Sequence, residues 1–342
     1  MADHKAPADG TAPYCSFIVP VYNRPDEVRD LLESLVAQSD PDFEIILVED
    51  GSTIPCGDVC KEYEGRIRVK YYYKSNEGRS IARNYGIDRA NGDFLIFVDS
   101  DCILPPDYVA RLKECRTENP ADCFGGPDAA HDSFTDLQKA INYSMTSFLT
   151  TGGIRGGKVQ LEKFVPRTFN MGYSREVYDK IGGFREMFSE DIDMSTRIRL
   201  AGFSIMLYRP VKVFHKRRVD LKKFWRQVHV FGMSRITLQL LYPGSMKIVH
   251  WLPAVFVVGA LAMIAASFFW KWMLLPLAVY ILAVWLCGIA ATRSLKIGTL
   301  GVVSSLTQLF GYGTGFIRAY VWKILLRHGR DIDQEIKMRK GK

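Results

Sequence analysis

The chain has 342 residues, of which 48% are apolar, and carries a formal net charge of +8. This length allows one large domain with an appendage, and the apolar content allows a substantial core. The basic excess would suit nucleic acid, but no recognition motif accompanies it, so we expect no nucleic-acid partner. The seven cysteines show neither CxxC nor Cys/His metal spacing, which excludes a zinc site of that kind and is typical of a reducing compartment.

The first two-thirds of the chain alternate between apolar runs and helical stretches. Residues 1–13, rich in Ala, Pro and Asp, precede this pattern and are predicted to be a disordered leader rather than a signal peptide. Four strands are predicted, at 16–24, 44–52, 67–73 and 94–98. Three helices alternate with them, at 27–38, 59–64 and 79–89. This alternation predicts an α/β domain with a parallel, doubly wound, Rossmann-like sheet.

Two carboxylates follow the fourth predicted strand. The run 91–102 reads NGDFLIFVDSDC and places Asp99 and Asp101 directly after buried residues. The free C-terminal end of such a strand can present oxygen ligands at the crevice where open α/β sheets bind substrates. This geometry favours a divalent cation that bridges nucleotide phosphates. An acidic turn without a ligand is the alternative for an isolated Asp-x-Asp.

The second half of this domain carries further glycine-rich and acidic segments. These are GGPD at 125–128, TTGGIRGGK at 150–158 and SEDIDMSTRIRLAGF at 189–203. The glycine-rich segment at 150–158 lacks the spacing and ending of a P-loop, so we expect a lid over an acceptor. The acids at the start of 189–203 are predicted in the first turn of a helix, where acids also complement the helix dipole.

Five motifs, in order, resemble those of family-2 glycosyltransferases of the GT-A fold. They are PVYNR at 20–24, VEDGS at 48–52, NEGRSIARNYGI at 76–87, DSD at 99–101 and the acidic segment 189–203. Together they cover roughly residues 14–220. They are specific for the superfamily but not for the sugar. The resemblance implies a nucleotide-sugar donor, with a UDP-sugar expected.

For the donor nucleotide, the resemblance implies a set of contacts at the ends of the strands. Asp50 would accept a hydrogen bond from the uracil N3–H, and Tyr22 and Asn23 would border the same pocket. Arg79 or Arg83 would pair with the nucleotide, because a guanidinium offers a planar fork of donors. A helix-surface ion pair is the alternative for either arginine. Two more residues of the matching motifs are expected at the donor site, Pro20 and Ser100.

For the diphosphate, the resemblance implies a divalent cation, Mn²⁺ or Mg²⁺. Asp101 would hold this cation, and Asp99 would face the ribose or the metal. His215, in VFHKRR, is a further candidate ligand, with a lipid-headgroup contact as the alternative. Three nearby arginines would clamp phosphate or bind the membrane surface, Arg217, Arg218 and Arg226.

The resemblance also implies an inverting mechanism in which one carboxylate takes the proton of the acceptor hydroxyl. Asp191 is the expected base, and Glu190 would orient the acceptor or the base. The alternative is that these acids only complement the helix dipole, as acids in a first helical turn ordinarily do.

The last third of the chain predicts membrane attachment. Ten Lys or Arg accompany a single acid between residues 209 and 250, and two uncharged stretches follow at 248–270 and 273–291. Each stretch is long enough to cross a bilayer, so we expect a transmembrane hairpin. Basic residues before and after it place the catalytic domain in the cytoplasm, on a multi-pass inner-membrane protein. The stretch 220–241 is predicted to lie on the bilayer as a basic amphipathic helix.

The predicted organisation is a leader at 1–13, a glycosyltransferase domain at 14–219, an interface helix at 220–247, the hairpin at 248–291 and a membrane-associated segment with a basic tail at 292–342. Within the last region, 298–326 could be a third span, a re-entrant segment or an interfacial helix.

The predicted activity is sugar transfer to a lipid-linked or membrane-proximal acceptor in bacterial polysaccharide or glycolipid synthesis. Three alternatives stay open. A polyprenyl-phosphate glycosyltransferase shares the fold, but the segment DSDCILPPDY lacks a Gln after the carboxylates. A processive polysaccharide synthase would show a clear QxxRW motif, at which FWRQVHVFG only hints. A catalytically idle membrane scaffold is disfavoured by the presence of all three candidate carboxylates.

Overall fold

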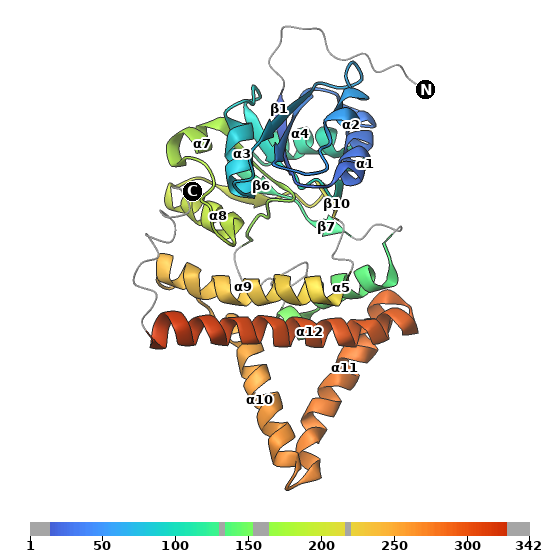
Figure 1. Cartoon of the computed structure of the whole chain (residues 1–342), viewed down its shortest axis with the longest axis vertical. Coiled ribbons are helices and arrows are strands. Elements are labelled where there is room, and N and C mark those ends of the chain that lie inside the picture. The colour runs from blue at the N-terminus through green and yellow to red at the C-terminus, as the bar shows by residue number, and fades with distance from the viewer. Residues whose placement is uncertain (1–13, 130–133, 153–163, 216–219, 327–342) are drawn as a thin grey trace. The chain divides into compact units, whose positions relative to one another are not determined.

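The computed structural model describes residues 14–129, 134–152, 164–215 and 220–326. The predicted leader, most of the predicted lid, Arg217, Arg218 and the basic tail lie outside these residues. The chain divides into two compact units, each described by itself. We call residues 14–129 and 164–215 the sheet unit, and residues 134–152 and 220–326 the helical unit (Figure 1).

The sheet unit is built on a seven-stranded sheet with the order β3-β2-β1-β4-β8-β6-β9. The first four strands of the chain pair in parallel with one another, as predicted. Their bounds are β1 Cys15–Val21, β2 Phe43–Asp50, β3 Val69–Lys74 and β4 Phe94–Phe97. β1 and β2 are buried almost throughout, because helices cover both faces of a doubly wound sheet. The rest of the sheet adds β6 Cys123–Gly125, β8 Met171–Ser174 and β9 Ile205–Leu207.

The prediction of a wholly parallel sheet is wrong at one strand. β8 runs antiparallel between β4 and β6. This strand has four residues, too few for a recognisable alternation, and its pairing depends on partners about 50 to 80 residues away in the chain. The α/β class and the double winding are confirmed.

Alternate residues of the strands feed two separate cores. Phe17 and Ile45 pack on one face with helices α1 Pro25–Val36 and α4 Tyr108–Glu118. Ile18 and Ile46 pack on the other face with α3 Arg79–Ile87 and α8 Glu190–Leu200. Two short helices complete the layers, α2 Gly57–Lys61 and α7 Arg175–Ile181.

A second, three-stranded sheet has the order β5-β10-β7. Its strands are β5 Cys102–Ile103, β7 Asp128–Ala129 and β10 Val213–His215. β5 follows the Asp-Ser-Asp turn, and β10 pairs with it antiparallel so that His215 lies opposite Cys102. The small sheet therefore brings a residue from the end of the unit beside the strand-end carboxylates.

The helical unit consists of six α-helices among its described residues. They are α5 Asp136–Thr146, α6 Phe148–Thr151, α9 Leu221–Leu241, α10 Leu252–Ser267, α11 Leu275–Thr292 and α12 Leu295–Tyr320. Short turns join or extend them, η1 Ile248–His250, η2 Lys271–Leu274 and η3 Val321–Leu325.

α5 and α6 lie within the predicted domain 14–219 in sequence, but they pack in the helical unit. The Tyr143 hydroxyl donates to the Val284 carbonyl at 2.9 Å, and the Tyr280 hydroxyl donates to the Leu149 carbonyl at 2.9 Å. Lys296 also forms an ion pair with Asp136 at 2.7 Å. These partners are more than 130 residues apart, so no local pattern in the sequence reveals them.

Glycines let α9 and α12 lie against each other along their length (Figure 1). A Cβ atom at Gly232 would lie 2.1 Å from the Tyr312 carbonyl oxygen, and one at Gly315 would lie 2.1 Å from the His229 carbonyl oxygen. Both distances are shorter than any real Cβ contact. Close backbone approach therefore requires glycine at these positions.

Part of the apolar face of α9 that is predicted to lie on a bilayer is covered within the helical unit. Phe224 and Val228 are buried in a core with Ile141 and Met145 of α5, and Tyr312 of α12 packs against it. The amphipathic pattern of the sequence marks the buried face of α9. Other helices of the chain cover this face: α5, which precedes α9, and α12, which follows it.

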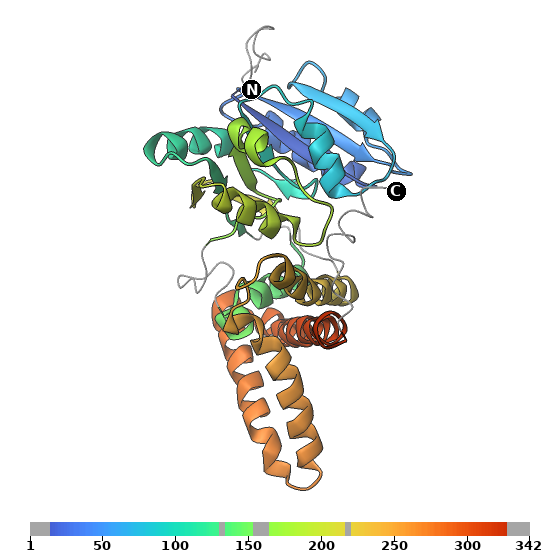
Figure 2. The same ribbon diagram turned by 90° about the vertical axis from the view of Figure 1, so that its left-hand side faces the viewer.

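α10 and α11 form an apolar helical hairpin, at the place predicted for it (Figures 1 and 2). Half of their large apolar side chains are exposed, and the turn between them carries Phe268 and Phe269 at 86% and 95% exposure. By length and composition, one segment of the described chain, Lys271–Thr292, is long and apolar enough to cross a membrane. α10 is apolar but shorter.

We expect Gly232→Ala to lower the thermal unfolding midpoint of the full chain, because its methyl group would force α9 from α12. Overpacking of this kind costs about 1–3 kcal/mol. Gly259→Ala is the matched control, since a Cβ there would meet no atom within 4 Å. Equal midpoints for the two variants in detergent would contradict the close packing.

Candidate active site

Asp101 lies between Arg24 and His215. The Arg24 Nη1 group donates to Asp101 Oδ2 at 2.5 Å, and His215 Nε2 lies 3.1 Å from Asp101 Oδ1. The His215 ring stacks on Phe169 with centroids 4.6 Å apart, which fixes its plane. Burial alone would raise the pKa of Asp101, but His215 and Arg24 together hold that pKa well below its ordinary value. Asp101 is therefore ionised at neutral pH.

The donor set around Asp101 fits a divalent cation. Ligand atoms of Asp101, Cys102 and His215 all lie within 4.8 Å of one another. A carboxylate oxygen and an imidazole nitrogen suit Mn²⁺, whereas the thiol of Cys102 contacts the Phe169 carbonyl at 3.6 Å. From the sequence, His215 has two interpretations, a metal ligand or a lipid-headgroup contact. In the structure its imidazole lies beside the Asp101 carboxylate.

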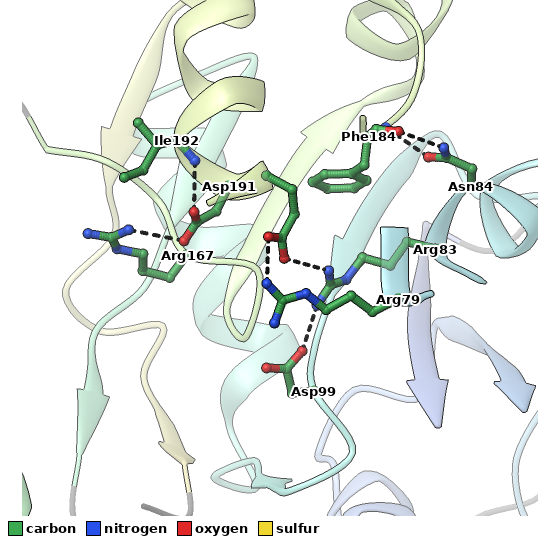
Figure 3. A network of polar contacts seen from close by, with 9 residues as sticks. Arg79, Arg83, Asn84, Asp99, Arg167, Phe184, Asp191 and Ile192 are labelled. Atoms are coloured by element: carbon green, nitrogen blue, oxygen red, sulfur yellow. Dashed lines mark hydrogen bonds and ion pairs between the residues drawn. The ribbon is translucent and has the colours of Figure 1, made fainter. Parts of the chain in front are cut away.

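A buried arginine joins the two acidic motifs (Figure 3). Arg83 Nη2 donates to Asp99 Oδ1 at 2.8 Å, and its Nη1 donates to Glu190 Oε1 at 3.0 Å. The Arg83 and Glu190 side chains are 1% and 2% exposed, whereas Asp99 is 33% exposed. Arg83 is buried, and both of its terminal nitrogens already donate hydrogen bonds. Its side chain therefore links the end of β4 to the start of α8 as a structural ion pair.

Arg79, one turn earlier on α3, contacts the same carboxylate from a more open position. Its Nη2 donates to Glu190 Oε2 at 2.7 Å, and its side chain is 55% exposed. Glu190 thus accepts from two guanidinium groups and is enclosed between them. Of the two arginines expected to pair with a nucleotide, Arg79 is the one with a side chain accessible from solvent.

The loop that follows α7 completes the enclosure of Arg83. The Asn84 side chain donates to the Phe184 carbonyl and accepts from the Phe184 amide, both at 2.8 Å. This reciprocal pair sets the Phe184 ring 5.7 Å from the Arg83 guanidinium carbon. Figure 3 shows Asn84 and Phe184 joined beside Arg83.

Asp191 stands in the first turn of α8, beside Arg167. Arg167 Nη1 donates to Asp191 Oδ2 at 3.1 Å, and the Ile192 amide donates to Asp191 Oδ1 at 2.8 Å (Figure 3). Burial would raise the pKa of Asp191, but Arg167 and Arg79 lower it below its ordinary value. Ser189, two residues before Asp191, has a φ of 63°, a left-handed conformation that turns the chain sharply into α8.

The carboxylate of Asp50 holds the turn before α3. It accepts from the Glu77 amide at 3.0 Å, the Gly78 amide at 2.9 Å and Lys74 Nζ at 2.9 Å. Glycine at 78 is required because φ there is 104°. Asp50 therefore lies at the end of β2, as predicted. Its carboxylate accepts hydrogen bonds from two backbone amides and from Lys74.

Asn23 plays a similar part between the first two strand ends. Its Oδ1 accepts from the amides of Thr53 and Ile54 at 2.8 and 2.9 Å. Tyr22 beside it is 50% exposed, whereas Pro20 forms part of β1. Ser100 is buried in the turn between Asp99 and Asp101.

Two contributors were missed by the sequence analysis. Arg24 stands in the PVYNR motif but was given no role, and Arg167 lies in no motif. The position of Arg24 after a strand end could have suggested it. No sequence signal marks Arg167, whose place depends on the bridge between Arg167 and Asn170.

Comparisons with known proteins agree with this geometry. Residues 16–182 match the family described as Glycosyl transferase family 2. This segment, just under half of the chain, is similar to family-2 glycosyltransferases.

Curated relatives share the domain but little else of their length. Glycosyltransferase GlyA of Streptococcus pneumoniae serotype 4 is 42% identical over 110 residues, which are 32% of this chain and 16% of that protein. The putative teichuronic acid biosynthesis glycosyltransferase TuaG of Bacillus subtilis is 35% identical over 134 residues, 38% of this chain and 53% of that protein. The chain thus spans from about a sixth to about half of these relatives.

A solved structure shares the fold over a longer stretch. The mannosyltransferase PcManGT from Pyrobaculum calidifontis, in complex with GDP-Man and Mn²⁺, has a TM-score of 0.55 and 17% identity. The match covers 96% of this chain and 91% of that chain. The family-2 domain described above therefore has the mixed α/β fold of known glycosyltransferases.

We expect Arg83→Met to destabilise the family-2 domain strongly, because Glu190 would lose a buried partner. Breaking a buried ion pair costs about 3–5 kcal/mol. Arg79→Met removes the more exposed guanidinium and should cost less than about 1 kcal/mol. Thermal unfolding of the two variants checks this difference. Equal shifts in the thermal unfolding midpoint of the two variants would contradict the structural role of Arg83 between β4 and α8.

Proposed function

We propose that the chain transfers a sugar from a nucleotide-diphosphate donor, expected to be a UDP-sugar, to a lipid-linked or membrane-proximal acceptor with inversion at the anomeric carbon. The observation that carries the proposal is the chain of contacts Asp99–Arg83–Glu190, which holds the donor-side carboxylate in fixed relation to α8. Asp191, ionised and next to Glu190, starts that helix. The family-2 match and the fold shared with PcManGT support it.

The donor would bind at the carboxyl ends of β1, β2 and β4. Tyr22 and Asn23 border this edge, and Asp50 shapes it by fixing the turn at Glu77 and Gly78. We infer that Arg79, rather than Arg83, turns toward the donor, since its guanidinium is accessible and held at one end only by Glu190. The complex of PcManGT with GDP-Man is consistent with a nucleotide-sugar donor for this fold.

Asp101 and His215 would hold the divalent cation, Mn²⁺ or Mg²⁺, with Asp99 nearby. Such a cation offsets the negative charge that develops on a leaving diphosphate. Arg24 keeps Asp101 ionised and turned toward His215, so the ligand is ready before any donor arrives. The Phe169 ring holds the imidazole in place.

Asp191 would act as the general base. As the acceptor oxygen forms its bond to the anomeric carbon, Asp191 takes the hydroxyl proton, and the bond from that carbon to the diphosphate oxygen breaks with its electrons. The products are the inverted glycoside and a nucleoside diphosphate. Arg167 keeps Asp191 ionised through the neutral pH range, and Glu190 positions it through its own contacts with the two arginines.

The helical unit would attach the enzyme to a membrane. α10 and α11 expose apolar side chains on most of their surface, and Lys271–Thr292 has the length and composition of a span. Under this proposal, the protein is a multi-pass protein of the inner membrane with the family-2 domain in the cytoplasm, because basic residues flank the hairpin. TuaG, a relative named for teichuronic acid biosynthesis, is consistent with a role in a cell-surface polysaccharide or glycolipid.

Asp191→Asn tests the base. The amide keeps the shape but cannot take a proton, so we expect kcat to fall by about 10²–10⁴-fold with donor affinity almost unchanged. Nucleoside diphosphate release and donor titration measure the two quantities. A variant that lost donor binding but kept kcat would contradict the role of Asp191.

Asp101→Ala tests the cation site. We expect weaker binding of Mn²⁺, measured calorimetrically on the full chain without donor, because the ionised oxygen ligand is gone. Asp58→Ala is the control, since its carboxylate is fully exposed and pairs only with Lys61 among the contacts found. Unchanged Mn²⁺ affinity in Asp101→Ala would place the cation elsewhere.

A further inference from the structure

Two acids end β2 and lie on opposite faces of the sheet. Side chains alternate along a strand, and Leu47 packs in one core of the sheet unit while Val48 packs in the other. Glu49 therefore faces the core of Leu47, and Asp50 faces the core of Val48. Glu49 is 0% exposed, so no substrate can touch its carboxylate.

The Glu49 carboxylate binds both ends of the segment 51–56, which follows β2 and precedes α2 and which we call the β2–α2 loop. Near the start of the loop, the Ser52 hydroxyl donates to Glu49 Oε1. At its end, the Cys56 amide donates to Glu49 Oε2 at 2.7 Å. The Tyr71 hydroxyl of β3 donates to the same oxygen at 3.3 Å. Without this carboxylate the buried donors would lose their partner, so the conformation of the loop depends on it.

Ser52 connects Glu49 to Asn23, which follows β1. The Asn23 amide donates to Ser52 Oγ at 2.7 Å. Asn23 has a φ of 55°, a left-handed conformation that residues other than glycine adopt rarely. Its Oδ1 accepts from the Thr53 and Ile54 amides of the loop at 2.8 and 2.9 Å. The conformations of Asn23 and of the β2–α2 loop are therefore fixed together, with the Ser52 hydroxyl between Asn23 and Glu49.

The outer side of the β2–α2 loop lies at the edge proposed for the donor. Ile54 is 60% exposed, and Tyr22, next to Asn23, is 50% exposed. The loop begins directly after Asp50, whose carboxylate fixes the turn before α3. Glu49 thus holds, from the inside, a surface that the proposed function assigns to the nucleotide.

We propose that Glu49 is a positioning residue for the donor nucleotide, an inference that rests on the proposed function. It holds the β2–α2 loop and, through Ser52, Asn23 in the arrangement that receives the nucleotide, without contact between its own carboxylate and the donor. Its removal weakens nucleotide binding and leaves the transfer step unchanged. In kinetic terms, KM for the donor rises while kcat stays the same.

Calorimetry on the full-length protein in detergent tests this role, with Mn²⁺ and either UDP or GDP as the probe. Glu49→Gln keeps the size of the side chain, but its amide NH₂ group would face a group that is itself a donor. We expect the Kd of the nucleoside diphosphate that the wild-type protein binds to rise about tenfold. Donor turnover at saturating donor concentration should stay within about twofold of the wild type. A fall in kcat with KM unchanged would overturn the inference.

Glu44→Gln is the matched control, because Glu44 is a buried acid at the other end of β2. Its carboxylate accepts from Ser16 Oγ at 2.8 Å and pairs with Lys70 Nζ at 2.9 Å. We expect this variant to lower the thermal unfolding midpoint and to keep the wild-type Kd. An equal rise in Kd in Glu44→Gln and Glu49→Gln would reduce the effect to general destabilisation and would also overturn the inference.

A double-mutant cycle shows whether Glu49 acts through Ser52. Ser52→Ala removes the hydroxyl between Glu49 and Asn23, so it should raise Kd by itself, and it carries the test if Glu49→Gln does not fold. Combined with Glu49→Gln, it should add little, because both changes break the same link. Additive changes in log Kd, or a wild-type Kd in Ser52→Ala, would rule out the proposed link.

Failure of the proposed function gives a different result from failure of this inference. A wild-type protein that binds neither UDP nor GDP would contradict the proposed function and this inference together. Wild-type binding that Glu49→Gln and Ser52→Ala both keep would contradict the inference alone.

Discussion

The sheet unit depends on the buried guanidinium of Arg83. Without it, the carboxylates of Asp99 and Glu190 would face each other across the end of the sheet, where like charges at low dielectric repel strongly. With it, the end of β4 and the start of α8 are tied together at 2.8 and 3.0 Å. A guanidinium so deeply enclosed is not available to a substrate, whereas the Arg79 side chain is 55% exposed.

The same principle of matched charge runs through the rest of the site. Asp101 is paired with Arg24 and His215, and Asp191 is paired with Arg167. Each of these pairs lowers the pKa of its carboxylate, which keeps both groups ionised despite burial. Under the proposed function, a donor diphosphate would bring further negative charge to this edge, and a divalent cation together with the exposed Arg79 would offset it.

The strands and the carboxylates at their ends could be predicted from the sequence because they depend on neighbouring residues. The four buried strands and the carboxylates at their ends followed from runs of apolar residues that end in polar turns, and the motifs 99–101 and 189–203 named the acids that face the site. The antiparallel β8, the two-residue β5 and the place of Arg167 depend on contacts between distant segments, which no period reveals. The packing of α5 in the helical unit and the burial of Phe224 on α9 also depend on contacts between distant segments. The glycines of α9 and α12 were visible in the sequence, but their meaning as points of backbone contact required both helices.

Under the proposed function, a nucleotide-sugar donor is turned over at the Asp101–His215 and Asp191 centre. The most direct measurement is nucleoside diphosphate release by the full-length protein in vesicles, with Mn²⁺, a panel of nucleotide sugars and a lipid acceptor that carries a hydroxyl group. We expect release from one donor, dependence on the cation, and loss in Asp191→Asn. Release from no donor, or equal release by Asp191→Asn, would contradict it.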